Sequence, residues 1–128
     1  MNPFKRLFRR IAVIFVTLWA RRTYNQGVQA AELRYKQTPH RDRRTIYLAA
    51  NSFHPDHLVT YDKVQFKNEK RAYGVHARLL TMNTLKQGCY YYTADKYGNN
   101  GMSAKEKEIR RRAFIQQRLR MARLLGQD

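Results

Sequence analysis

Residues 58–93 read LVTYDKVQFKNEKRAYGVHARLLTMNTLKQGCYYYT, and this stretch carries the turn signals of a compact folded unit. It opens with a β-like run at 58–61, passes through a polar, helix-like segment, and returns to a β-like run at 89–93. Asp62 can act as the N-cap of that helix, and Gly74 stands where a helix-ending glycine is expected. We therefore predict a small α+β core over residues 44–94.

The segment before this stretch completes the predicted sheet. Residues 45–50 (TIYLAA) form a β-like run in which Ile46 and Leu48 face one side and Tyr47 the other. Asn, Ser, Pro and Asp in residues 51–57 indicate a turn, so this run should pair with 58–61 as a hairpin. Residues 75–82 (VHARLLTM) fit either another strand or a turn of helix. The sequence thus predicts an antiparallel sheet of three or four strands.

The N-terminal segment, residues 1–36, is predicted to be a long helix that ends at Thr38 and Pro39, with Gly27 as a weak point inside it. Large apolar residues recur in it at helical spacing. They are Phe4, Leu7, Phe8, Ile11, Phe15, Leu18 and Trp19.

Residues 11–20 are apolar nearly all round, which is not typical of a helix in water. Three interpretations follow: a buried core helix, which we favour, a docking surface for a protein partner, or a helix lying on a membrane surface. The run is about half of the ~20 residues needed to span a bilayer, so a spanning helix is not expected. A membrane surface ranks last of the three interpretations. The residues that would dock a partner are Ile11, Ile14, Phe15, Leu18 and Trp19.

The C-terminal segment, residues 103–125, is predicted to be an arginine-rich helix. Ser103 and Glu106 fit the S-x-x-E capping box that satisfies free amides at a helix start, and Gly126 would end the helix. The fold class predicted from all these segments is α+β, a small antiparallel sheet with long N-terminal and C-terminal helices.

The chain is strongly basic for its 128 residues: 26 Lys and Arg against 9 Asp and Glu give a net charge of +17. This charge favours a polyanionic partner, most simply a nucleic-acid backbone bound without sequence specificity. DNA, RNA and an acidic protein all remain open, as does a merely solvated helix face. The terminal helices have the densest positive charge and supply the candidate contacts Arg9, Arg10, Arg21, Arg22, Arg110, Arg111, Arg112, Arg118, Arg120 and Arg123.

Residues with the chemistry of an enzyme are not arranged in a recognisable pattern. The segment HPDH at 54–57 has metal-binding atoms, but its Pro and Asp are explained by turn chemistry. Cys89 lies in an aromatic run and is predicted to be a buried, unreactive thiol, and Tyr90, Tyr91 and Tyr92 to pack rather than stack on bases. We expect no catalytic residues, no metal and no cofactor.

A weak family resemblance spans about residues 31–120. The residues that carry it are Ile46, Tyr47, Leu58, Val59, Tyr61, Asp62, Lys63, Phe66, Lys67 and Tyr73, with the run from Cys89 to Thr93. In these the chain resembles small basic proteins of crAss-like Bacteroides phages and related mobile elements. The resemblance implies a virion component at the capsid interior, portal or tail, found in the virion or in the host cytoplasm during assembly.

The function predicted from the sequence is that of a non-enzymatic structural protein in a large nucleoprotein assembly, with neighbouring subunits and packaged DNA as partners. Two alternatives stay open: a ribosome-associated RNA-binding protein, and a peripheral membrane-surface protein anchored by residues 3–22.

Overall fold

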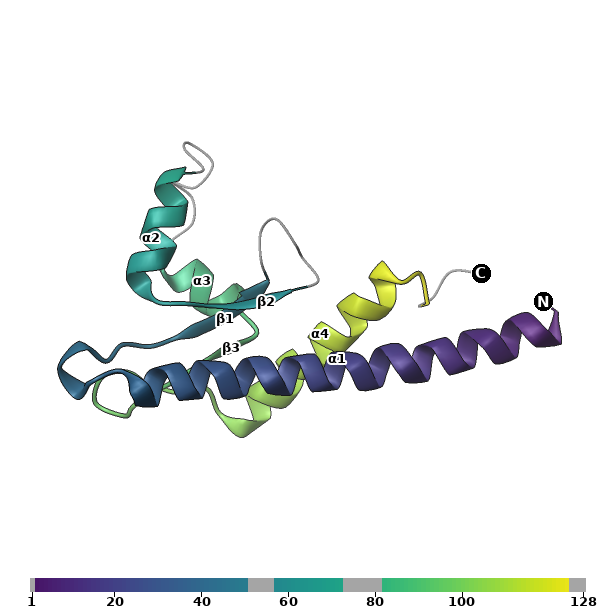
Figure 1. Cartoon of the computed structure of the whole chain (residues 1–128), viewed down its shortest axis with the longest axis horizontal. Coiled ribbons are helices and arrows are strands. Elements are labelled where there is room, and N and C mark those ends of the chain that lie inside the picture. Colours follow the sequence, from purple (N-terminus) through teal and green to yellow (C-terminus); the bar gives the residue numbers. More distant parts are fainter. Residues whose placement is uncertain (1, 51–56, 73–81, 125–128) are drawn as a thin grey trace.

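The computed structural model describes residues 2–50, 57–72 and 82–124, and shows the predicted α+β fold. One long helix runs along an edge of the molecule, the sheet and two short helices lie on one side of it, and the last helix crosses it obliquely (Figure 1). The elements in chain order are α1 (Pro3–Gln37), η1 (His40–Asp42), β1 (Tyr47–Ala50), β2 (Leu58–Tyr61), α2 (Lys63–Ala72), α3 (Met82–Gly88), β3 (Tyr91–Tyr92) and α4 (Ala104–Met121).

The described sheet has three strands in the order β2-β1-β3, and both pairings are antiparallel. Tyr47 of β1 lies opposite Tyr61 of β2 and Tyr92 of β3, which confirms the predicted hairpin. Ile46 and Leu48 are buried, as their alternation with Tyr47 predicts. The hairpin turn at 51–56, Gly74 and residues 75–81 lie outside the described residues; Met82, the last residue of the predicted fourth run, begins α3.

The predicted end of α1 is confirmed. Asn2 caps its first turn by accepting a hydrogen bond from the backbone N–H of Phe4, and Thr38 is the C-cap. Gly27, expected only to weaken the helix, proves to be a point of close approach. A Cβ at this position would lie 2.9 Å from Cδ2 of Leu48, so glycine lets α1 approach β1.

The core lies between α1, the sheet and α4. The buried Tyr24 hydroxyl donates hydrogen bonds to the carbonyls of Tyr90, at 2.7 Å, and Lys107, at 3.3 Å. The ring of Tyr90 meets Phe114 edge-on at 5.1 Å. Burial raises the pKa of Tyr24 to about 12 and also raises the pKa of the Cys89 thiol. Cys89 is buried and Tyr90 and Tyr91 pack against the core, as predicted, while Tyr92 lies against Tyr47 of β1 with ring centroids 6.5 Å apart.

The helix caps predicted from local sequence are present. Asp62 accepts a hydrogen bond from the N–H of Gln65 at 2.8 Å, while the Gln65 side chain accepts one from the N–H of Asp62 at 3.1 Å. At the start of α4 the Ser103 hydroxyl accepts a hydrogen bond from the N–H of Glu106 at 3.2 Å, which is one half of the predicted capping box, while the Glu106 carboxylate accepts from Arg110 at 2.9 Å. Capping bonds of this kind satisfy amides that have no partner inside the helix.

The end of α4 differs from the prediction, because the helix stops at Met121 rather than near 125. Arg123 adopts a left-handed backbone conformation with φ of 58°, and the N–H of Leu124 reaches the carbonyl of Leu119 at 2.8 Å. These bonds form a Schellman ending. Leu124 also packs against the core cluster, and this contact explains why the helix ends before Gly126 despite an arginine at the left-handed position.

Candidate docking and anion-binding surface

The N-terminal half of α1 exposes a row of large apolar side chains that are 44–79% accessible to solvent. We call this row the outer stripe. It consists of Phe4, Leu7, Phe8, Ile11, Ile14, Phe15, Leu18 and Trp19. The preferred prediction of a buried core helix over 11–20 is therefore wrong for these residues, because the rest of the described chain packs elsewhere. All five residues predicted to dock a partner belong to the outer stripe.

The outer stripe faces away from the core. Phe15 and Tyr24 are nine residues apart, so at about 100° per residue their side chains point to opposite sides of the helix. The packed side carries Ala20, Tyr24 and Val28, all buried. After Trp19 the next residue on the outer face is polar. This residue is the exposed Arg22, one turn after Leu18.

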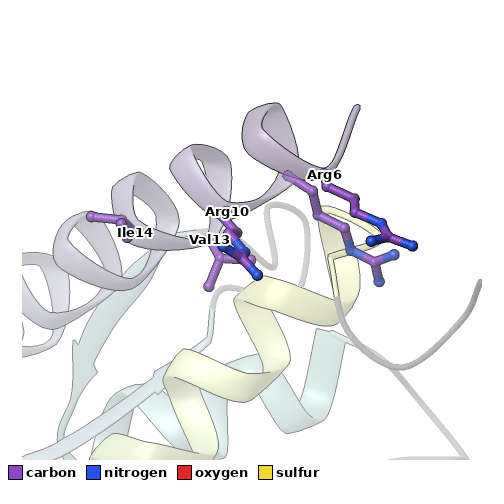
Figure 2. Close-up of a pocket in the computed structure, with 5 residues that line it drawn as sticks. Arg6, Arg10, Val13 and Ile14 are labelled. Carbon is purple, nitrogen blue, oxygen red and sulfur yellow. The ribbon is translucent and has the colours of Figure 1, made fainter. Parts of the chain in front are cut away.

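A cleft of about 610 Å³ opens on one side of this half of α1 and is lined by Arg6, Arg9, Arg10, Val13 and Ile14. In Figure 2 the side chains of Arg6 and Arg10 extend from α1 toward the C-terminal end of α4. Arg9 donates a hydrogen bond to the carbonyl of Leu124 at 3.4 Å. The carbonyls at a helix C-terminus carry partial negative charge, which favours cations at this position.

The described lining of this cleft is basic and apolar. Among the described residues that line it none is acidic, and the first acidic residue of the chain is Glu32. We refer to Arg6, Arg9 and Arg10 as the arginine cleft. Sequence reasoning selected Arg9 and Arg10 but missed Arg6, although the i, i+3, i+4 spacing of the three residues indicates one helix face.

A second pocket, of about 510 Å³, lies between α1 and the end of α4. The described residues that line it are apolar except for one arginine: Phe15, Val16, Trp19, Arg118, Met121 and Ala122. The Arg118 guanidinium lies over the Trp19 ring, 4.8 Å from its centroid, and donates to Sδ of Met121 at 3.5 Å. Its Nε is buried and has no hydrogen-bond partner among the described residues.

Three of the predicted phosphate-contacting arginines on α4 are half-buried and have partners inside the protein. Arg110 has a side chain only 16% exposed and donates to Glu106 at 2.9 Å and to the carbonyls of Lys86 and Cys89 at 2.8 and 2.7 Å. Arg111 pairs with Glu108, and Arg118 lies over Trp19. Two of these, Arg110 and Arg118, connect α4 to other parts of the fold.

The remaining candidates are exposed but do not share one surface. Arg10 lines the arginine cleft and Arg22 lies on the outer face of α1, one turn after the outer stripe. Arg112 is exposed and pairs with Glu108 at 3.2 Å, which with Arg111 lowers the pKa of that carboxyl. Three further candidates are also exposed: Arg21, Arg120 and Arg123.

Metal and membrane-spanning features were also sought in the described ranges. Within them, no group of three or more His, Cys, Asp or Glu side chains could hold a metal ion, and residues 54 and 56 of the HPDH segment lie outside them. No helix in residues 2–50, 57–72 or 82–124 is long and apolar enough to cross a membrane.

Comparisons with known proteins return no match: no family model fits the chain, and no curated protein or solved structure is significantly similar to it. The proposals below therefore depend on the geometry of the outer stripe, the arginine cleft and the second pocket.

Proposed function

We propose that this chain is a non-enzymatic structural protein of a large nucleoprotein assembly, in which it contacts a nucleic-acid backbone and neighbouring protein subunits. The arginine cleft carries the proposal. Three guanidinium groups on one helix face, in a cleft whose described lining is basic and apolar, suit the phosphate groups of a polyanion. The resemblance to phage proteins suggests a virion as the assembly.

The physical basis of such binding is counterion release. Each arginine that neutralises a phosphate frees condensed cations, so affinity falls steeply as salt rises. The Arg9 guanidinium is also held against fixed backbone by its hydrogen bond to the carbonyl of Leu124, so it loses less freedom on binding than an extended surface side chain. The cleft should therefore contribute more to binding than its share of the total charge.

The proposal is tested by measuring affinity for a random-sequence DNA duplex over a range of salt concentrations. The double variant R6Q/R10Q should reduce the slope of log affinity against log salt by roughly 2, since each phosphate contact contributes about 0.9. Arg9 is left unchanged because it also bonds to the end of α4.

The matched control is R41Q/R44Q, which removes the same charge from exposed positions near η1, remote in sequence from the cleft. Its slope should change by well under 1. An equal reduction in both variants would mean that the duplex responds only to net charge, and a flat salt dependence of the unaltered protein would reject nucleic-acid binding altogether.

A further inference from the structure

The second pocket has the character of an anchor site for a protein partner. We infer that the outer stripe and this pocket together bind an amphipathic segment of a partner protein, with an apolar side chain filling the pocket and a carboxylate pairing with Arg118. The inference deepens the proposed role in an assembly, on which it rests, by naming the chemistry of the neighbouring subunit.

Arg118 is the key residue, and its contrast with Arg110 shows why. Both lie on the same helix and both are partly buried, but Arg110 donates to one carboxylate and two carbonyls. Arg118 has only the sulfur of Met121 and the face of Trp19 as described partners, and its Nε has none. Burying a guanidinium donor without an acceptor is costly, and the terminal nitrogens of Arg118 have only this weak sulfur acceptor within the described chain. These terminal nitrogens are the donors that an acceptor from outside the chain can reach.

The positive charge around the pocket indicates that the partner segment is negatively charged. The part of the lining that the structure describes includes no carboxylate, and α1 carries no acidic residue before Glu32. A partner with Asp or Glu beside its apolar anchor would gain a charge-assisted, bidentate contact with Arg118. A second copy of this chain, with the same net charge of +17, would meet strong repulsion instead.

The shape of the site favours protein over a lipid surface. An apolar stripe alone would suit a bilayer interface, where fluid chains cover any apolar ridge. Here the stripe adjoins a cavity of about 510 Å³ with one fixed guanidinium at a tryptophan, a combination typical of protein hot spots. From Phe4 to Trp19 the stripe is about 23 Å long at 1.5 Å per residue, which matches a partner helix of roughly four turns.

Trp19 is the chain's one tryptophan and lines the pocket, so its fluorescence reports occupancy directly. The probe is a synthetic helical peptide of Leu, Ala and Glu with one apolar face, titrated into the full chain at a salt concentration that screens long-range attraction. We expect saturable binding with a blue shift of Trp19 emission. A peptide with Gln in place of Glu should bind about tenfold more weakly.

Protein variants then identify the residue that responds to the carboxylate. R118Q should weaken the Glu peptide about tenfold and should not weaken the Gln peptide further, whereas R120Q removes the same charge from an exposed position of α4 and should change affinity less than about twofold. The duplex salt slope of R118Q should match that of the unaltered protein, so failure of this inference is distinguishable from failure of nucleic-acid binding.

Two results would overturn the inference. One is that R118Q and R120Q weaken peptide binding equally, which would attribute the effect to net charge, or that the Glu and Gln peptides bind equally, which would attribute it to apolar contact alone. The other is a Trp19 shift with vesicles of phosphatidylcholine and phosphatidylserine, equal in the unaltered protein and R118Q, without peptide binding. That result would assign the stripe to a membrane surface.

Discussion

The two halves of α1 form one uninterrupted helix but have opposite relations to the rest of the protein. Between residues 4 and 19 its largest side chains are exposed, whereas from Ala20 to Ala31 it buries Tyr24 and Val28 against the sheet and α4. Both halves are rich in apolar residues. The difference shows that helix formation here depends on local sequence, while burial depends on whether another element lies alongside.

The contrast between the two halves of α1 also predicts which residues stabilise the fold and which bind a partner. Residues of the packed half contact the core and should control folding, whereas those of the outer stripe are largely exposed, with Trp19 lying beside Arg118, and should control association. Substitutions of similar size in the two halves should therefore have very different effects on the free energy of unfolding.

The largest expected effect comes from truncating one aromatic side chain in each half. Tyr24→Ala should lower the free energy of unfolding by about 3–5 kcal/mol, because it opens a cavity in the core and removes the hydroxyl bonded to Tyr90. Phe8→Ala, at a side chain 77% exposed, should change it by less than about 0.5 kcal/mol. Urea denaturation measures both. A comparable loss in Phe8→Ala would show that the outer stripe packs within the chain.

A smaller effect is expected where α1 approaches the sheet. Gly27→Val should destabilise the protein by about 1–3 kcal/mol, since the new side chain would meet Leu48 in a filled core. Gln26→Val, one position away on an exposed side, should change the free energy of unfolding by about 0.5 kcal/mol or less. If both variants melt at the same temperature, the close packing of α1 on β1 is contradicted.

The smallest predicted effect is alkaline destabilisation through Tyr24. Because burial raises its pKa to about 12, the neutral hydroxyl stabilises the folded state fully below pH 10 and loses this contribution between pH 10 and 12. At pH 11 about 1.4 kcal/mol should be lost relative to pH 8. The free energy of unfolding of Tyr24→Phe should fall by less over the same interval, because this variant lacks the Tyr24 hydroxyl. The loss that remains comes from the other tyrosines, which titrate in both proteins. An identical fall would exclude Tyr24 as the source.

Much of the architecture was predictable from short-range patterns. The alternation of Ile46, Tyr47 and Leu48 indicated a strand with one buried face, and Ser103 marked the start of α4 by its spacing from Glu106. Such features depend on residues within one turn or one strand of each other. The end of α4 was placed wrongly because it depends on the packing of Leu124 against the core rather than on Gly126.

The candidate site was predicted less completely. The apolar docking residues and Arg9 and Arg10 were selected from their residue types, but Arg6 was missed and Arg110 was assigned to phosphate. Arg110 in fact reaches carbonyls at Lys86 and Cys89, more than twenty positions earlier in the chain. Composition cannot distinguish an arginine that faces solvent from one that donates hydrogen bonds to buried acceptors.

The sequence by itself determined the α+β class, the long terminal helices, the hairpin and the strongly positive charge, because these follow from periodicity, capping residues and counts of ionisable groups. Only the tertiary structure decided that the outer stripe stays uncovered, that three arginines share a cleft, and that Arg118 meets Trp19 beside a pocket. The physical reason is that burial and pairing are properties of contacts between distant segments, and the crossing of α4 over α1 creates these contacts.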